Sequence, residues 1–220
     1  MDIDWFINEL YPLQDQVLRL INRIKTGFYL TGGTALSRGY LNHRFSDDLD
    51  FFVNDEERFL LWGDRIIQGL LHPTKWKVEV LLKEERFIRL NLSWKNINLK
   101  IELINDVPAH TGKIKLHPQL GKIDSAENIL ANKVTAALDR SAPKDLADIY
   151  GLVCIMNLSL NDALLDAKSK AAGVFPADLA RVLCSVTKAD WESVRWIKSP
   201  DAETFISRLQ SLGQSLIVPA

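Results

Sequence analysis

The segment around residues 28–34 has the composition of a phosphate-binding turn. A short β-prone run ends at Gly32-Gly33, and a helix is predicted to begin directly afterwards, at Thr34. Glycines at such a junction let backbone amides approach a phosphate at the positive end of the helix, and Thr34 adds a hydroxyl group. A Gly-Gly pair alone is more often an ordinary turn, so its meaning depends on the residues that come after it in the chain.

Two aspartates share one face at the start of the next predicted strand, residues 49–53. Asp48 and Asp50 are two residues apart, a spacing that in a strand points both side chains to the same side. Paired carboxylates repel each other unless a cation lies between them, and magnesium or manganese prefers such oxygen ligands. Asp-rich strand entries can also be simple turn caps, but together with the glycine turn they predict a metal–nucleotide site.

A third carboxylate is available on a later strand, predicted over residues 97–104. Alternate residues from Leu99 to Leu103 mark its buried face, so Glu102 lies on the opposite face with Lys100. A two-metal phosphoryl-transfer site uses an acidic ligand from a neighbouring strand, which makes Glu102 a candidate metal ligand. The alternative is a solvated glutamate on a half-exposed sheet.

The C-terminal half places a lysine on an apolar helix face. At 100° per residue, Lys133 falls inside the apolar arc of the predicted helix 125–139. Such a lysine either snorkels to the surface or points its ammonium group at an anion such as a triphosphate. Asp145 lies near the start of the next helix, 143–157, where an acid can equally be only a dipole partner. The short connection between the helices predicts that Lys133 and Asp145 lie within reach of each other.

An α/β half followed by an all-helical half must position these residues. Residues 105–124, rich in Pro, Gly, His and Lys, are interpreted as a linker, and a capping box of Asp124 and Glu127 is expected just after it. We therefore expect an α+β fold with two lobes, residues 1–112 and 113–220. Strands are predicted over 28–30, 49–53, 76–82, 87–94 and 97–104, with a hairpin turn at Lys95-Asn96 between the last two. Helices are predicted over 5–25, 34–40, 56–71, 125–139, 143–157, 160–172, 177–186, 189–197 and 201–214. The first of these helices is expected to be interrupted near Pro12.

Composition and charge describe an ordinary globular chain. Of the 220 residues 47% are hydrophobic and 25% are charged, and 27 basic against 28 acidic residues leave a net charge of −1. No global field therefore draws the protein to nucleic acid or to a membrane. Acidic residues stand where a signal peptide has basic ones, no window is apolar enough to span a bilayer, and Cys154 and Cys184 lie in apolar stretches typical of buried free thiols. We expect a cytoplasmic protein with no membrane partner.

Two stretches of the sequence resemble one known family, the nucleotidyltransferase toxins of the AbiEii/AbiGii type. The matching residues are Gly32-Gly33-Thr34-Ala35-Leu36 and His43-Arg44-Phe45-Ser46-Asp47-Asp48-Leu49-Asp50-Phe51-Phe52, then Lys133, Arg140, Lys144-Asp145 and Asp148-Ile149-Tyr150. The resemblance implies a DNA-polymerase-β-like nucleotidyltransferase core, a mixed sheet with flanking helices, followed by an all-helical C-terminal lobe. It also implies magnesium- or manganese-dependent transfer of a nucleoside monophosphate from a nucleoside triphosphate (NTP) to an acceptor, in toxin members the 3′ end of tRNA, with a cognate antitoxin as partner.

Carried onto this sequence, the resemblance assigns metal binding and catalysis to Asp48 and Asp50, and catalytic roles to Lys133 and Asp145. Glu102 remains the candidate third metal ligand. The expected nucleotide-binding set is Gly32, Gly33, Thr34, Arg44, Ser46 and Lys144. Because the broader superfamily has Gly-Ser where this chain has Gly-Gly, phosphate binding is expected to rest on backbone amides and Thr34.

Three functions remain open at this point. The chain could transfer nucleotides to tRNA as a toxin, transfer them to a small molecule or a protein side chain, or bind nucleotides without turnover. Basic residues outnumber acidic ones seven to three over residues 75–100 and six to three over 113–144. These segments suit an RNA acceptor, but solvated faces explain them equally well.

Overall fold

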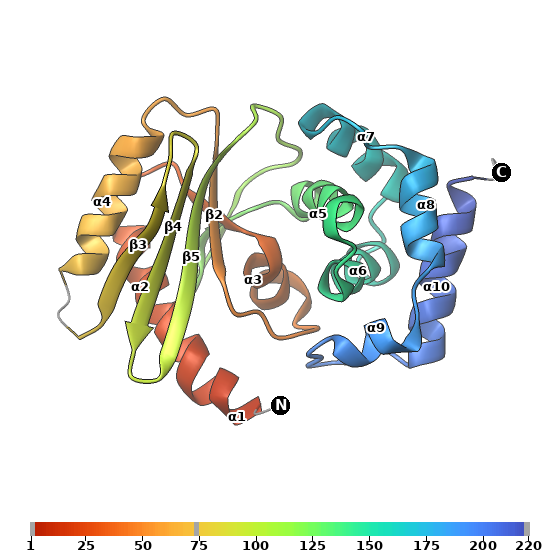
Figure 1. The fold of residues 1–220 in the computed structure, drawn as a ribbon, viewed down its shortest axis with the longest axis horizontal. Coiled ribbons are helices and arrows are strands. Elements are labelled where there is room, and N and C mark those ends of the chain that lie inside the picture. The colour runs from red at the N-terminus through yellow and green to blue at the C-terminus, as the bar shows by residue number, and fades with distance from the viewer. Residues whose placement is uncertain (1–2, 73–74, 218–220) are drawn as a thin grey trace. The chain divides into compact units, whose positions relative to one another are not determined.

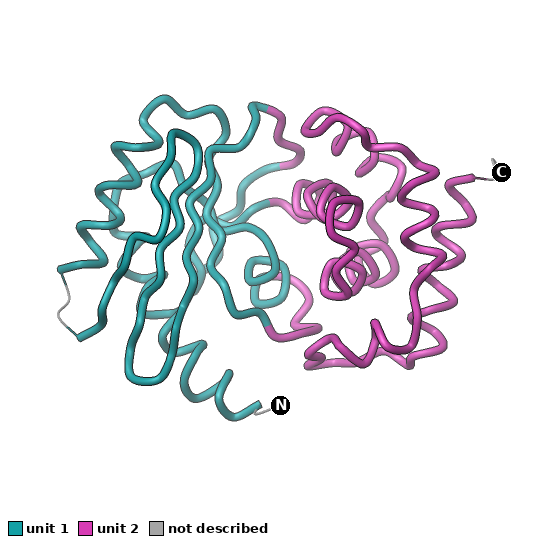
Figure 2. The backbone as a smooth tube through the Cα atoms, viewed as in Figure 1, with its two compact units in different colours: residues 1–39, 46–108, 113–124 teal, residues 40–45, 109–112, 125–220 magenta. Residues whose placement is uncertain are grey.

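The computed structural model describes residues 3–72 and 75–217, which form two compact units (Figures 1 and 2). Unit 1 contains residues 1–39, 46–108 and 113–124, and unit 2 contains residues 40–45, 109–112 and 125–220. The division is therefore not a single cut near residue 112. Two short segments before that point belong to unit 2, and residues 113–124 belong to unit 1.

Unit 1 is built on a seven-stranded mixed sheet with the strand order β3-β4-β5-β2-β1-β7-β6. At its centre, β2 pairs in parallel with β5 and antiparallel with β1. The predicted hairpin at Lys95-Asn96 joins β4 to β5, and Lys95 has the positive φ of 52° that such a turn requires. The strands are β1 (Tyr29–Thr31), β2 (Leu49–Asn54), β3 (Lys77–Lys83), β4 (Phe87–Trp94), β5 (Ile97–Asp106), β6 (Lys115–His117) and β7 (Gly121–Ile123).

Helices α2 and α4 cover one face of this sheet (Figure 1). Gly63 of α4 lets the helix approach closely, since a Cβ atom there would lie 2.4 Å from Ile88 Cδ1 of β4. Pro12 is the second residue of α2, and a π-helical turn precedes it at the expected interruption. The helices of unit 1 are α1 (Ile3–Trp5), the π-helical turn η1 (Phe6–Leu10), α2 (Tyr11–Arg23), α3 (Gly32–Leu36) and α4 (Phe59–Leu71), and the π-helical turn η2 (Ser37–Leu41) leads on into unit 2.

Unit 2 is helical, with α5 packed against α6, α7 and α8, and α10 packed against α8. The segment 40–45 joins it through a backbone bridge between Arg44 and Trp196 and a 2.8 Å hydrogen bond from Phe45 N to the Arg195 carbonyl. Its elements are α5 (Ala126–Arg140), α6 (Pro143–Tyr150), the π-helical turn η3 (Gly151–Ile155), α7 (Leu160–Lys170), α8 (Pro176–Cys184), α9 (Lys188–Ser193) and α10 (Ala202–Ser215). The predicted α+β class with a helical C-terminal region is thereby confirmed.

The interpretation of residues 105–124 as a linker alone is wrong. This segment contains β6 and β7, which form an antiparallel hairpin, and Ile123 of β7 pairs in parallel with Leu30 of β1. A two-stranded hairpin this short is stable only when it joins a larger sheet. The two strands therefore depend on pairing with β1, which is distant in sequence, and such short strands cannot be predicted from their own residues alone.

Two further expectations are corrected. The N-cap of α5 is Ser125, which accepts a hydrogen bond from Asn128 N at 3.1 Å, whereas the buried Asp124 accepts one from the Thr31 hydroxyl at 2.6 Å. Cys154 and Cys184 are free thiols but partly exposed rather than buried. No helix formed by residues 3–72 or 75–217 combines the length and apolar character needed to cross a membrane.

Candidate functional site

The three predicted carboxylates lie together on the central strands of unit 1. Asp48 immediately precedes β2, Asp50 is the second residue of β2, and the parallel register pairs Asp50 with Glu102 of β5. Residues alternate between buried and partly exposed along β2, and Asp50 is on the partly exposed side with Phe52. The fold therefore brings Asp50 and Glu102 to one face of neighbouring strands.

Lys100 lies among these carboxylates. Its Nζ atom is 3.0 Å from Asp48 Oδ2 and 3.5 Å from Glu102 Oε1. Burial lowers the pKa of Lys100, but the charges of Asp48, Glu102 and Asp50 outweigh this effect and raise the pKa above its ordinary value. Glu102 also accepts a 2.7 Å hydrogen bond from Arg89 Nε. The carboxylates are thus partly neutralised by side chains of the protein itself.

The donor chemistry of this group suits a hard divalent cation at Asp48 and Asp50. Carboxylate oxygens are the ligands that magnesium uses in proteins. Among the residues that the structure describes, no three His, Cys, Asp or Glu side chains are arranged to hold a metal ion. Glu102 is engaged by Arg89 and Lys100. Metal binding by Asp48 and Asp50 stays a prediction.

The predicted glycine turn lies directly against Asp50. Gly32 begins α3 straight after β1 and has a φ of +67°, in the left-handed region that glycine adopts without strain. A Cβ atom at this position would lie 2.5 Å from Asp50 Oδ2. The backbone conformation favours glycine at position 32, and a Cβ atom there would displace the Asp50 carboxylate, which links the two sequence signals in space.

Thr34 and Ser46 connect the glycine turn to the segment that carries the aspartates. The Thr34 side chain is buried, donates a hydrogen bond to the carbonyl oxygen of Asp48, and shares a 3.0 Å hydrogen bond with Ser46 Oγ. Both hydroxyl groups therefore hold residues 46–48 against α3. Phosphate binding by Gly33, Thr34 and Ser46 stays a prediction.

Lys133 is buried within an ion network of unit 2. Its Nζ atom lies 2.8 Å from Asp145 Oδ1 and 2.7 Å from Asp148 Oδ2. The prediction that Lys133 faces the buried side of α5, close to Asp145, is confirmed. Arg140 donates to both oxygens of Asp145, at 2.8 and 3.1 Å. Burial raises the pKa of Asp145, but Arg140 and Lys133 outweigh it and lower that pKa.

Asp148 joins this network and was not among the predicted site residues. It is fully buried, accepts two hydrogen bonds of 2.7 Å from the Arg44 guanidinium and lies 2.9 Å from His43 Nε2. Burial raises the pKa of Asp148, but Arg44, Lys133 and His43 hold it well below its ordinary value of 3.8. A sequence signal exists, since Asp148 follows Asp145 by three residues and so shares its helix face.

The remaining predicted residues of unit 2 differ in their placement. Arg44 is buried, and its guanidinium group also donates to the Phe45 carbonyl at 2.9 Å. Lys144 is an exposed residue of α6, and the structure does not bring it into the network around Lys133.

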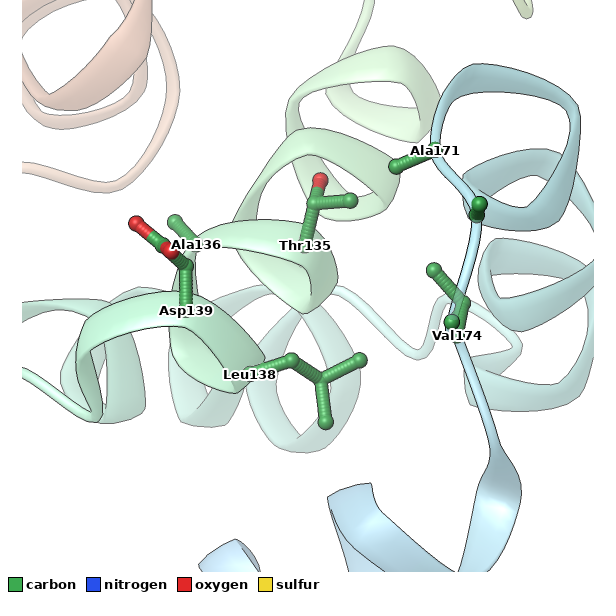
Figure 3. Close-up of a pocket in the computed structure, with 8 residues that line it drawn as sticks. Thr135, Ala136, Leu138, Asp139, Ala171 and Val174 are labelled. Atoms are coloured by element: carbon green, nitrogen blue, oxygen red, sulfur yellow. The ribbon is translucent and has the colours of Figure 1, made fainter.

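A pocket of about 520 Å³ lies on another face of α5 (Figure 3). Thr135, Leu138 and Asp139 of α5 line it together with residues 171–174. Thr135 follows Lys133 by two residues, which turns it about 200° around the helix axis. The pocket is therefore separate from the ion network.

Comparison with known proteins identifies one family across most of the chain. Residues 21–204 match the family model described as the nucleotidyl transferase AbiEii toxin of a type IV toxin–antitoxin system. This range includes every predicted site residue. No protein of curated function matches the chain in sequence.

Several solved structures share the fold. JHP933 from Helicobacter pylori matches with a TM-score of 0.63 and 22% identity, covering 95% of this chain and 92% of that one. MenT4, a nucleotidyltransferase toxin from Mycobacterium tuberculosis H37Rv, matches with a TM-score of 0.65 and 16% identity, covering 96% and 84%. The antibiotic-resistance factor ANT(2'')-Ia matches with a TM-score of 0.50 and 13% identity, covering 72% and 91%. At these identities the likeness is one of fold.

Proposed function

The chain belongs to the AbiEii family of nucleotidyltransferase toxins, and we propose that it transfers a nucleoside monophosphate from an NTP to the 3′ end of tRNA. Family membership makes it a nucleotidyltransferase and implies an NTP substrate and an antitoxin partner. The observation that supports the proposal is the contact between the Gly32 turn and Asp50, because it brings the proposed phosphate-binding turn to a proposed metal ligand. NTPs and tRNA are cytoplasmic, so the proposed reaction is a cytoplasmic one.

In unit 1 we assign phosphate binding and cation binding to different residues. The backbone of Gly32 and Gly33 approaches the phosphates, and Asp48 and Asp50 bind magnesium or manganese. A divalent cation bound there supplies charge neutralisation for the triphosphate and activation of the acceptor hydroxyl. Thr34 and Ser46 fix the segment that carries Asp48. In the transfer, the acceptor oxygen bonds to the α-phosphorus while the bond to the bridging oxygen breaks and pyrophosphate leaves.

In unit 2 we assign the triphosphate contact to Lys133. The network brings three cationic groups, Arg44, Lys133 and Arg140, to the two carboxylates of Asp145 and Asp148. A buried ammonium group such as that of Lys133 needs anionic partners, and a triphosphate could add to those that the two aspartates supply. Asp145 orients Lys133, and Lys144 on the surface of α6 is a second proposed phosphate contact. Arg44 uses three guanidinium nitrogens on Asp148 and the Phe45 carbonyl, so we assign it a positioning role rather than direct nucleotide binding.

The acceptor is tested by following the nucleotide. The purified protein is incubated with each α-³²P-labelled NTP, magnesium and total cellular RNA, and the label is measured in tRNA, other RNA, protein and small molecules. The proposal expects label at the 3′ end of tRNA. Label in protein or in a small molecule would show that the protein is a nucleotidyltransferase whose acceptor is not tRNA. Nucleotide binding without label in any fraction would identify a catalytically inactive nucleotide-binding protein.

A further inference from the structure

Lys100 occupies the place where a site of three carboxylates would hold a cation. It precedes Glu102 by two residues on β5 and therefore lies on the same face of the strand. Its ammonium nitrogen is 3.0 Å from Asp48 and 3.5 Å from Glu102, and its side chain is 39% exposed. The ammonium group thus bridges carboxylates from two neighbouring strands.

Arg89 holds the same oxygen of Glu102 that faces Lys100. The antiparallel register pairs Arg89 of β4 with Glu102, and Arg89 Nε lies 2.7 Å from Glu102 Oε1. A magnesium ion sits about 2.0–2.1 Å from its ligand oxygen. An ion bound through Glu102 Oε1 would therefore face both the guanidinium and the ammonium group at short range, and would have to displace at least one of them.

The charge balance around the site favours a single divalent cation. Asp48, Asp50 and Glu102 contribute three negative charges, and Arg89 and Lys100 contribute two positive ones, which leaves a net charge of −1. One divalent cation turns this into +1, a charge that suits a triphosphate. Two divalent cations would raise it to +3 without any further acid to balance them within this group.

We propose that the site binds one divalent cation, through Asp48 and Asp50, and that the ammonium group of Lys100 takes the place of a second. The inference rests on the proposed function for the identity of the site. It reassigns Glu102 from metal ligand to the partner that holds Lys100. It also predicts that Lys100, and not only the aspartates, determines how many ions the protein holds.

The test is a Mn²⁺ titration of the full chain without nucleotide or acceptor, in which electron paramagnetic resonance counts the bound ions. We expect one ion for the wild-type protein, two for Lys100→Met and for Lys100→Gln, and one for Lys100→Arg, which keeps the positive charge. Lys77→Met removes an exposed lysine from the edge strand β3, which β4 separates from β5, and should leave the count at one. Glu102→Gln should also leave it at one, whereas Asp50→Asn should lose the ion. Thermal unfolding checks that each variant is folded.

Several outcomes would overturn the inference. These are two ions or none in the wild-type protein, an unchanged count in both neutral Lys100 variants, loss of the ion in Glu102→Gln, or retention of the ion in Asp50→Asn. Because the titration contains no substrate, it separates this inference from the proposed function. A protein that binds two ions and still transfers nucleotides refutes only the role of Lys100, whereas one that binds a single ion and transfers none refutes only the function.

Discussion

Asp148 is a single carboxylate that holds together segments about a hundred residues apart in the chain. Its partners are His43 and Arg44 from the segment before β2 and Lys133 from α5. All four side chains are at least nine-tenths buried. Removing one member of a buried ion pair leaves the others without a counter-charge, which costs far more than losing a pair at the surface.

We therefore predict that Asp148→Ala lowers the free energy of unfolding by about 3–5 kcal/mol, because Arg44 and Lys133 lose a buried counter-ion. Glu192→Ala, which removes an exposed ion pair with Lys188, should change it by no more than about 1 kcal/mol. Urea unfolding at neutral pH measures both values. Equal losses for the two variants would show that the Asp148 network does not stabilise the fold.

The same residue predicts a pH dependence of stability. The pKa of Asp148 is depressed in the folded protein, so folding favours its ionised form. This contribution is fully present above the ordinary pKa of 3.8 and is lost as the pH falls through the lower pKa of the folded state. The difference in unfolding free energy between the wild-type protein and Asp148→Asn should stay constant from pH 7 to about pH 5 and shrink below about pH 4. A difference that shrinks near pH 6 would contradict this assignment.

At the scale of the elements, the turn from β1 into α3 is shaped by one neighbour. Gly32 and Gly173 both have positive φ values, +67° and +80°. A Cβ atom at Gly32 meets Asp50, whereas one at Gly173 has nothing within 4 Å. The two glycines therefore share their backbone requirement and differ in the contact with Asp50.

Alanine variants of these two glycines should both lose stability but should differ in activity. Alanine in the left-handed region costs about 1–2 kcal/mol, so Gly32→Ala and Gly173→Ala should both lower stability by at least that amount. Only Gly32→Ala displaces Asp50, and only this variant should lose nucleotide transfer. Initial rates of transfer, set beside thermal unfolding curves, check the difference. Full activity in Gly32→Ala would show that the turn is not part of the site.

The sequence predicted the elements that carry their own periodicity. The amphipathic helices, the alternating strands β2, β4 and β5, and the buried face of Lys133 all follow from side chains within one segment. The short strands β6 and β7 could not be predicted in this way, since they depend on pairing with β1. The ion pair of Arg44 with Asp148 depends likewise on residues 104 positions apart. Lys100 was placed on the face of Glu102, but only the structure brings it to Asp48.

At the scale of the whole molecule, the pairing of basic residues limits the attraction for RNA. Four of the seven basic side chains in residues 75–100 form ion pairs, namely Lys83, Arg86, Arg89 and Lys100. The net charge of the chain is −1. Ion pairing therefore reduces the number of basic side chains in residues 75–100 that can replace the counterions of a nucleic acid.

We accordingly predict a shallow salt dependence for tRNA binding. Six phosphate contacts cost about 10³ in affinity between 50 and 200 mM salt, and this protein should lose clearly less. Fluorescence anisotropy of labelled tRNA at several salt concentrations measures the slope. A loss of affinity of that size or more would mean that the basic side chains break their ion pairs in order to bind phosphate.

We propose that nucleotide transfer takes place at Asp48 and Asp50, and the Asp50→Asn variant examines this assignment. The variant keeps the size of the side chain and removes the charge that binds the cation. Asp64→Asn, at an exposed acid of α4 in the same unit, is the matched control. The measurements, on variants shown to be folded, are pyrophosphate release from γ-³²P-labelled NTP and transfer of label from α-³²P-labelled NTP to tRNA. The account predicts that Asp50→Asn loses transfer while Asp64→Asn keeps the wild-type rate, and near-normal transfer by Asp50→Asn would contradict it.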